Sequence, residues 1–337
     1  MVLMPPFQTS LPEGALLENL RSSFSKVMDI SNDMVLLGLV SNNTIGRVRF
    51  SQPDKPVEEI REASESLSDL LTYPETEELF IDLLERFAVQ SGVSGVQPKV
   101  LWNEQDKKIA LPHENYILKS AGRDFPGLAV NKFFCLTAAS KAGLKTPEFY
   151  LSDNGELLVV KRFDVTDEGK ALAFDETCTL LNKPNHGKYT GSYEGVVDII
   201  QKVPCVSVGQ TNRDLFKTIA FSMLIRNGDD HLKNFSITYN KATEVSLAPF
   251  YDLVNTTVYL PKDQTALTFN GAKTWPTDDS LEAFGLSVCG LRKKETRRLL
   301  DEVKTGISAS LPAIEQCGRD NPQHETLCKS LAEVYRA

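Results

Sequence analysis

No apolar stretch of the sequence approaches the roughly 18 residues that a membrane-spanning helix requires. The segment Met1 to Pro6 has neither the basic start nor the long apolar core of a signal peptide. The chain also contains no internal repeat and no low-complexity segment. We therefore expect a globular protein that stays in the cytoplasm and has no membrane partner.

Cysteine spacing argues against a zinc site. The six cysteines form no C-x-x-C pair, and their spacing to the four histidines does not fit a zinc ligand set. Free and mostly buried thiols are therefore expected.

Basic residues are fewer than acidic residues. The sequence has 37 Lys and Arg against 45 Asp and Glu, which gives a formal net charge of −8. Residues 54–86 hold 11 acids and 3 bases, so this stretch accounts for the whole excess. Its segment 77–85 predicts an amphipathic surface helix, and a linker with such a helix is favoured over a docking site. An acidic chain without a basic stripe is a poor DNA binder, so DNA contact is expected only through a partner protein.

Three oxygen-bearing side chains stand out instead. Asp229 and Asn234 lie in one polar run, and the isolated Asp252 follows downstream. Phosphoryl transfer needs one carboxylate facing the acceptor hydroxyl and hard oxygen ligands for Mg²⁺, which this set can supply. The competing interpretation is structural, with an Asx turn at Asp229 and Asp230 and a cap of the next element at Asn234. His231 is expected to fix the loop through hydrogen bonds, because Asp229 is the better-placed base.

The surrounding pattern favours phosphoryl transfer. Residues 212–226 carry apolar side chains at helical spacing, which predicts a buried helix ended by residues 227–228. Residues 235–239 and 245–248 predict a hairpin that brings Asp252 to the mouth of the same loop. Helix, polar loop, hairpin and acid in this order are typical of a kinase C-lobe.

A nucleotide also requires a phosphate cradle and a lysine. Residues 91–99 form a loop of small residues whose backbone N–H groups can approach phosphate oxygens. The loop matches neither G-x-G-x-x-G nor Walker A, so an ordinary Gly/Ser turn is the alternative. Residues 116–119 predict a strand ending on Lys119, either an edge-strand charge or the lysine of a kinase N-lobe. Residues 157–164 predict a buried strand that leads into a connector between two lobes.

Together these pieces resemble the HipA family, the kinase toxins of bacterial toxin–antitoxin systems, including the shorter HipT type. The resemblance rests on six ordered motifs: Val93–Lys99, Ile117–Lys119, Asp124–Ala129, Arg162–Asp164, Asp229–Ser236 and Pro249–Asp252. It covers the kinase body and weakens after about residue 275.

By this resemblance, Asp229 is the catalytic base, and Asn234 and Asp252 are the Mg²⁺ ligands. The nucleotide loop comprises Ser94, Gly95, Val96, Gln97, Pro98 and Lys99. The other implied ATP-binding residues are Lys119, Lys161, Arg162, Phe163, His231, Lys233, Asn234, Tyr251 and Asp252. The implied cofactors are ATP and Mg²⁺.

The family is regulated by autophosphorylation of a serine in the nucleotide loop, which ejects the loop. Ser94 matches one of the two positions used in the HipT type, whereas the other is Gly92 here and Ser91 lies one place off the pattern. Phosphorylation adds nearly two negative charges beside the nucleotide phosphates, which gives the switch an electrostatic cause. Ser94 is therefore the expected site, and Ser91 is the alternative.

One position departs from the family pattern. Relatives often carry glutamate after the asparagine of the first helix that faces the C-lobe, whereas this chain has Lys132 after Asn131. Lys132 cannot pair with Lys119 as a carboxylate would. Another residue must then orient the side chain of Lys119, or the kinase activity is altered.

The N-terminal region implies partners. Residues 1–50 resemble only the end of the family's accessory subdomain, with a helix through Phe24 and the segments 35–40 and 45–50. In three-component members a separate small protein resembles the missing part, which implies such a partner here; a reduced, self-sufficient lobe is the alternative. The resemblance further implies a helix-turn-helix antitoxin of the HipB type and a protein substrate, an aminoacyl-tRNA synthetase in known relatives.

Two regions lie outside the motifs. Residues 183–195 are rich in Gly, Pro and Tyr and predict a long loop, either activation-loop-like and facing substrate or a surface excursion. Residues 281–335 carry Leu at helical spacing and predict a helical cap on the C-lobe.

At 337 residues the chain is long enough for two lobes. We expect an α+β, two-lobed protein-kinase-like fold with a truncated N-terminal subdomain and a mainly helical C-lobe. The expected domains are residues 1–88 with the accessory subdomain and acidic helix, 89–163 as nucleotide-binding N-lobe, and 164–337 as C-lobe. The expected activity is phosphorylation of a serine or threonine hydroxyl. A small-molecule kinase and a non-catalytic co-repressor scaffold are the alternatives, the latter supported mainly by Lys132.

Overall fold

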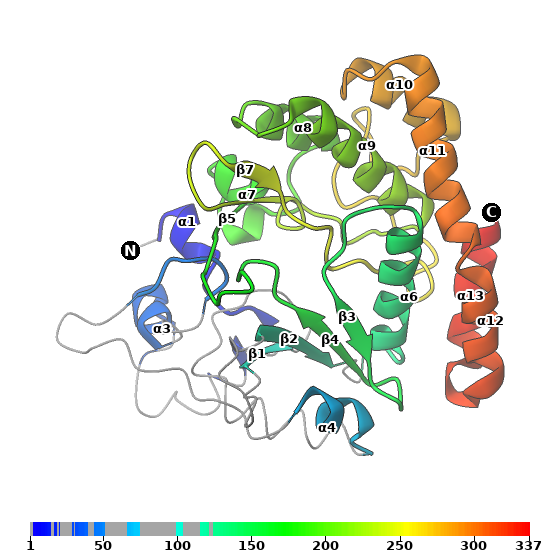
Figure 1. The fold of residues 1–337 in the computed structure, drawn as a ribbon, viewed down its shortest axis with the longest axis horizontal. Coiled ribbons are helices and arrows are strands. Elements are labelled where there is room, and N and C mark those ends of the chain that lie inside the picture. Colours follow the sequence, from blue (N-terminus) through cyan, green and yellow to red (C-terminus); the bar gives the residue numbers. More distant parts are fainter. Residues whose placement is uncertain are drawn as a thin grey trace. The chain divides into compact units, whose positions relative to one another are not determined.

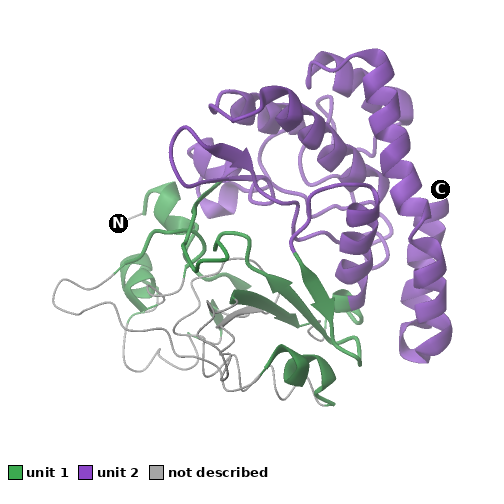
Figure 2. Cartoon of the chain, viewed as in Figure 1, with its two compact units in different colours: residues 1–129, 148–175 green, residues 130–147, 176–337 purple. Residues whose placement is uncertain are grey.

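The computed structural model describes residues 3–14, 17–18, 20, 29, 31–39, 44–50, 66–74, 99–103, 115–120 and 124–337. The chain divides into two units, each assembled from two stretches of sequence (Figure 2). Unit 1 comprises Met1–Ala129 and Glu148–Asp175, and unit 2 comprises Val130–Pro147 and Glu176–Ala337. The domain boundaries expected at residues 88 and 163 stay predictions.

Unit 1 contains an antiparallel sheet with the strand order β1-β2-β4-β3 (Figure 1). The strands are β1 (Lys99–Asn103), β2 (Asn115–Ser120), β3 (Phe149–Leu151) and β4 (Leu157–Lys161). β2 and β4 contain the two apolar runs that predict strands, and all four residues from Leu157 to Val160 are buried. Lys119 is paired with Leu158 in the register, so the backbone of the predicted phosphate lysine is fixed within the sheet.

Short helices surround this core in the described part of unit 1. They are α1 (Pro5–Gln8), α3 (Asp33–Leu39) and α4 (Leu67–Thr72). One apolar core joins the helices to the sheet, and it contains Leu3, Leu11, Leu20, Leu36, Leu37, Leu70, Tyr116, Leu118, Leu157 and Val159. The segment 35–40 lies mostly in α3, whereas the helix predicted at 77–85 lies outside the described residues.

Unit 2 is mainly helical (Figure 1). Its helices are α6 (Leu128–Lys141, beginning with two residues of unit 1), α7 (Thr177–Leu180), η2 (Asn185–Gly187), α8 (Tyr193–Gln201), α9 (Val208–Leu224), α10 (Asp278–Ser287), α11 (Lys293–Ser308), α12 (Leu311–Asp320), η3 (Pro322–His324) and α13 (Glu325–Arg336). The strands β6 (Ser236–Tyr239) and β7 (Val245–Leu247) form an antiparallel hairpin, and β5 (Ala173–Glu176) leads the chain into the unit. The predicted hairpin and the predicted helical C-terminal region are both confirmed.

Helix α9 contributes many buried residues to the core of unit 2. Leu215, Phe216 and Ile219 are fully buried because the helix contributes to the core from more than one face. The predicted helix at 212–226 is thus confirmed, but it ends at Leu224. The earlier end arises because Arg226 adopts the left-handed backbone region with φ of 58°, which a continuing helix does not allow.

The loop predicted at residues 183–195 is shorter than expected. The Ser192 hydroxyl accepts a hydrogen bond from Gly195 N at 3.0 Å, and this cap starts α8 at Tyr193. The short 3-10 helix η2 occupies a further part of the segment. The sequence interpretation missed the Ser192 cap, so the loop prediction was wrong for residues 193–195.

Two further features bear on the expectations for membrane helices and for the cysteines. Within the ranges that the structure describes, no helix is both long enough and apolar enough to cross a membrane. The six cysteines carry free thiols, and Cys135, Cys178, Cys289 and Cys328 are buried.

Candidate active site

The loop between α9 and β6 carries the predicted catalytic residues. It begins at Arg226, whose guanidinium lies over the Trp275 ring at 5.2 Å. Gly228 occupies a space without room for a side chain, because a Cβ there would lie 2.6 Å from Thr256 Oγ1. Gly228 N also donates a hydrogen bond to that hydroxyl at 2.9 Å. The backbone is therefore held in place immediately before Asp229.

Asp229 and Asn234 are joined across a tight turn. The Asn234 side-chain nitrogen donates to the Asp229 carbonyl oxygen at 2.9 Å, and His231 N donates to the same oxygen at 2.9 Å. Since the amide nitrogen is engaged, the side-chain oxygen of Asn234 is the group that remains for a cation. The Asx turn that the structural interpretation places at Asp229 and Asp230 is not present there, because the Asx hydrogen bond runs from Asp229 N to Asn227 Oδ1 at 3.2 Å. The bonds to the Asp229 carbonyl oxygen form a backbone turn, which fixes the positions of Asp229 and Asn234 relative to each other.

Asp252 follows β7 in a left-handed backbone conformation with φ of 56°. Its Oδ1 lies 2.5 Å from Nζ of Lys132 on α6, and the two side chains are 18% and 6% exposed. Helix α6 also contacts the segment after Asp252. The side-chain amide of Asn131 makes two 2.9 Å hydrogen bonds with the backbone of Asn255. The residue that departs from the family pattern is therefore the ion-pair partner of a predicted metal ligand.

Tyr189 contacts the predicted base. Its hydroxyl donates a hydrogen bond to Asp229 Oδ1 at 2.5 Å. The ring of Tyr189 packs edge-on against His231 with 5.0 Å between ring centroids, and Nζ of Lys188 lies 5.5 Å from the Tyr189 centroid. The segment predicted as an activation-like loop thus directly contacts the predicted catalytic base.

Asp230 differs from its neighbour in environment. It is fully buried, and within the described residues neither carboxylate oxygen has a hydrogen-bond partner of good geometry. Burial raises the pKa of Asp230 to about 8; the nearby Ser222 hydroxyl lowers it, and the charges of Asp229 and Asp252 raise it. Asp230 is therefore mostly protonated at neutral pH and adds little charge to the site.

His231 is held neutral. Burial lowers the pKa of His231 to about 4, and the positive charges of Lys188 and Lys233 act in the same direction. In the described part of the chain, the ring nitrogen Nδ1 has no hydrogen-bond partner. We predicted that hydrogen bonds from His231 fix the loop, but its Nδ1 atom makes none within the described residues. The ring packs against the Tyr189 ring instead.

Two further ATP-binding candidates of unit 2 tie the loop to its surroundings. The Tyr251 hydroxyl donates to the Lys233 carbonyl oxygen at 2.7 Å and lies 2.9 Å from Ser236 Oγ. Nζ of Lys233 donates to Asn185 Oδ1 at 3.4 Å. Burial raises the pKa of Tyr251 well above its usual value, so the phenol keeps its proton. The structure therefore brings Asp229, His231, Lys233, Asn234, Tyr251 and Asp252 together in unit 2.

The predicted nucleotide residues of unit 1 lie on the sheet and at its exit. Lys119 is 5% exposed on β2. Nζ of Lys161 lies 3.6 Å from Glu148 Oε2 at the end of β4. The Phe163 ring lies 6.0 Å from the Phe174 ring.

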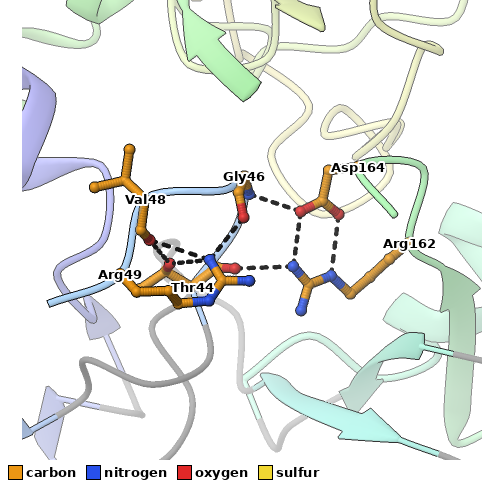
Figure 3. A network of polar contacts seen from close by, with 6 residues as sticks. All are labelled: Thr44, Gly46, Val48, Arg49, Arg162 and Asp164. Atoms are coloured by element: carbon orange, nitrogen blue, oxygen red, sulfur yellow. Dashed lines mark hydrogen bonds and ion pairs between the residues drawn. The ribbon is translucent and has the colours of Figure 1, made fainter. Parts of the chain in front are cut away.

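Arg162 forms the centre of a polar network in unit 1 (Figure 3). Its Nε and Nη2 donate to the two Asp164 carboxylate oxygens at 3.0 and 2.7 Å, and Nη2 also donates to the Thr44 carbonyl oxygen at 2.8 Å. Gly46 N donates to Asp164 Oδ2 at 2.6 Å, while Arg49 donates to the Gly46 carbonyl oxygen at 2.7 Å. The Arg162 guanidinium, which the resemblance implies as part of the ATP site, thus fastens residues 44–49 to Asp164 within unit 1.

The nucleotide loop lies outside the described residues. This applies to the predicted regulatory serines and their neighbours Ser91, Ser94, Gly95, Val96, Gln97 and Pro98. Lys99 is described only as the first residue of β1. The roles assigned to these residues stay predictions.

The oxygen donors of the loop fit Mg²⁺. The described residues contain no group of three or more His, Cys, Asp or Glu side chains that could hold a metal ion by itself. Mg²⁺ does not need such a group, because it binds one or two carboxylates and completes its shell with water and phosphate oxygens. The Asp252 carboxylate and the Asn234 side-chain oxygen are therefore a suitable pair of ligands.

Comparison with protein families decides which family this site belongs to. Residues 91–311 match the model of the HipA-like C-terminal domain. The chain belongs to this HipA-like family. The matched range includes Asp229, Asn234 and Asp252, so the family assignment covers the predicted catalytic residue, the predicted metal ligands and the β6–β7 hairpin.

A solved HipA structure has the same fold. HipA of Shewanella oneidensis MR-1, in a complex with HipB and its operator DNA, aligns with a TM-score of 0.71 over 98% of this chain and 84% of that chain. The sequence identity is 19%, so the comparison concerns the fold. The predicted HipA resemblance and the predicted α+β kinase-like fold are confirmed.

Curated relatives of this HipA-like chain carry kinase names. "Putative kinase Y4dM" of Sinorhizobium fredii is 27% identical over 299 residues, which cover 81% of this chain and 67% of the relative. A "Putative kinase" of Haemophilus influenzae is 30% identical over 182 residues, which cover 50% of this chain and 53% of the relative. The chain therefore spans about two thirds of the first relative and about half of the second.

Tyr189 and Asp230 are the residues of this HipA-like site that sequence reasoning did not identify. Tyr189 lies 40 residues before Asp229, and no periodicity connects the two. Asp230 stands beside the predicted base, and nothing in the sequence distinguishes a buried acid from an exposed one in a polar run. The presence of a tyrosine in the loop was the one available signal for Tyr189.

Proposed function

We propose that this HipA-like chain is an ATP- and Mg²⁺-dependent serine/threonine protein kinase. The observation that carries the proposal is the fixed relationship of Asp229 and Asn234, with the amide nitrogen tied to the Asp229 carbonyl oxygen at 2.9 Å. Asp252 adds a second oxygen ligand, and its charge acts on the same loop. One base and two hard oxygen ligands are what phosphoryl transfer requires of a protein kinase.

In the proposed reaction, Asp229 accepts the proton of a serine or threonine hydroxyl while that oxygen forms a bond to the γ-phosphorus of ATP. The bond from the γ-phosphorus to the oxygen bridging to the β-phosphate breaks at the same time, and ADP leaves. Tyr189 binds one carboxylate oxygen of Asp229 and so fixes the orientation of the base. Asn234 and Asp252 would hold Mg²⁺, which when bound neutralises charge on the phosphates. Lys119 is proposed to contact the nucleotide phosphates.

The proposed biological role is that of a toxin in a toxin–antitoxin system. A helix-turn-helix antitoxin of the HipB type is the proposed partner, and the Shewanella relative in complex with HipB and operator DNA supports it. The net charge of −8 makes this chain a poor DNA binder, so DNA contact is proposed only through the antitoxin. The family resemblance supports an aminoacyl-tRNA synthetase as substrate and a small accessory protein as second partner.

Autophosphorylation is proposed at Ser94, with Ser91 as the alternative. The support is the match of Ser94 to a loop position of the HipT type and the electrostatic effect of a phosphate beside the nucleotide.

The test is an incubation of the purified chain with labelled ATP, Mg²⁺ and a cell extract, followed by mapping of phosphorylation sites. Asp229→Asn is the matched inactive variant. We expect serine or threonine phosphate on an extract protein and phosphate on Ser94, both in the wild type only. Label found in metabolites instead of protein would favour a small-molecule kinase.

A non-catalytic scaffold is the second candidate, because the ammonium of Lys132 already occupies an oxygen of Asp252. Equal, background labelling by the wild type and Asp229→Asn would favour it. A clear difference between the two would exclude it.

A further inference from the structure

An ammonium group occupies one side of the proposed magnesium site. Nζ of Lys132 lies 2.5 Å from Asp252 Oδ1, and Lys132 is 5% exposed. The ammonium carries a full positive charge and only donates hydrogen bonds, so it neutralises the oxygen that it contacts. A metal ion that used the same oxygen would lie close to the ammonium group and be repelled by its positive charge.

The fold keeps Lys132 at this position. Its neighbour Asn131 makes two 2.9 Å hydrogen bonds with the backbone of Asn255, and both asparagines are fully buried. These bonds join α6 to the loop three residues after Asp252. The left-handed backbone of Asp252 further sets the direction of its carboxylate. The contact is therefore part of the structure of unit 2 and not a solvated surface pair.

The charge around the loop also disfavours a second dication. Two carboxylates and two lysines have charges that reach His231: Asp229, Asp252, Lys188 and Lys233. Lys132 already offsets one of the two carboxylates. With one carboxylate already offset, the protein itself offers less negative charge to a second dication, so that ion would depend mainly on the nucleotide phosphates.

We propose that Lys132 takes the place of a second metal ion, so that this chain binds a single Mg²⁺ with its nucleotide through Asn234 and the other oxygen of Asp252. Protein kinases use the equivalent Asp and Asn to hold two Mg²⁺ ions. The inference rests on the proposed kinase function and deepens it. Lys132 is then a positioning residue of the metal site, a role that glutamate at this position could not fill.

The test counts metal ions directly. The purified full chain is saturated with a non-hydrolysable ATP analogue and titrated with Mn²⁺, and the electron paramagnetic resonance signal of free Mn²⁺ gives the number of bound ions. We expect one ion for the wild type and for Lys132→Arg, which keeps the charge. We expect two ions for Lys132→Met, which is of similar length and neutral. Lys141→Met is the matched control on the same helix, since its Nζ binds the Ala309 carbonyl oxygen, and it should bind one ion.

Two bound ions in the wild type would overturn the proposal and leave the kinase function standing. This count is decisive even if Lys132→Met does not fold. A folded Lys132→Met that binds one ion or none would also overturn it, because Lys132 would then not substitute for an ion. No nucleotide-dependent Mn²⁺ binding by the wild type would overturn the kinase proposal itself and this inference with it.

Discussion

The hydroxyl of Tyr189 donates a 2.5 Å hydrogen bond to Oδ1 of Asp229. The backbone is anchored on both sides of this tyrosine: Leu232 N donates to the Lys188 carbonyl oxygen at 3.1 Å, and Thr268 N donates to the Gly191 carbonyl oxygen at 3.0 Å. Because the segment is fixed at both ends, the position of the phenol is set by the fold. Tyr189 therefore orients the carboxylate that is proposed to accept the substrate proton.

Replacement of Tyr189 by Phe keeps the ring and removes the hydrogen bond. We expect kcat to fall roughly tenfold with little change in the KM for ATP, since a hydrogen bond to a charged group contributes about 1.5 kcal/mol or more. Steady-state kinetics of phosphate transfer measure this. Tyr193→Phe is the control, because its hydroxyl binds the backbone oxygen of Asp230 and not the carboxylate of Asp229. A rise in kcat for Tyr189→Phe would show that the phenol blocks the acceptor.

Asp230 should make the stability of the protein fall as the pH rises. Burial raises its pKa from 3.8 to about 8, so the folded state binds the proton more tightly than the unfolded state between these values. The free energy of unfolding attributable to Asp230 is then highest below about pH 4 and decreases up to about pH 8. Asp230→Asn cannot ionise and should gain stability relative to wild type across this range, as measured by urea unfolding at several pH values. A constant difference between the two proteins would contradict the assignment.

Asp164 should show the opposite pH dependence. Burial alone would raise its pKa, but the charge and hydrogen bonds of Arg162 outweigh burial and hold the pKa below 3.8. Its contribution is therefore present above about pH 4 and lost as the pH falls through the folded value. Asp164→Asn leaves Arg162 buried without a counter-charge and should cost about 3–5 kcal/mol near pH 7. Asp198→Asn, which breaks the exposed pair with Lys202, should cost under about 1 kcal/mol. Equal losses in the two variants would refute a special role for the network.

Gly306 should tolerate no side chain. A Cβ at this position of α11 would lie 2.2 Å from Ala142 N and 2.3 Å from Ala142 Cα, and backbone atoms cannot move aside as a flexible side chain can. We expect Gly306→Ala to lower the free energy of unfolding by about 1–3 kcal/mol in thermal or urea unfolding. Gly209→Ala, in α9 with its nearest neighbour at 3.6 Å, should be neutral or slightly stabilising. Unchanged stability of Gly306→Ala would contradict the close approach.

The elements that the sequence predicts correctly are those that depend on local pattern. Helix α9, the β6–β7 hairpin and the strand β4 each follow from periodicity within one short segment. The order of Asp229, Asn234 and Asp252 follows from spacing within one loop and its hairpin. The residues involved are close together in the sequence, so the local residue pattern is enough to predict these elements and this order.

Long-range contacts could not be predicted in the same way. The partner of Lys132 lies 120 residues away, so the sequence marks Lys132 as unusual without indicating Asp252. Gly228 illustrates a second limit. The sequence interpretation uses it as part of a helix stop, whereas the structure requires its small size against Thr256, and Arg226 makes the left-handed turn. Whether a position requires a small side chain or a left-handed backbone depends on the packing of segments that are distant in sequence.

Phosphate incorporation by the purified wild-type chain and by Asp229→Asn, measured side by side with labelled ATP and Mg²⁺, tests the central claim most directly. Asparagine has nearly the same size as aspartate and cannot accept a proton, so the fold should remain while transfer is lost. We predict phosphate on the wild-type chain and a loss of at least about 100-fold in the variant, the lower range for removal of a general base. Equal incorporation by the two folded proteins would contradict the account.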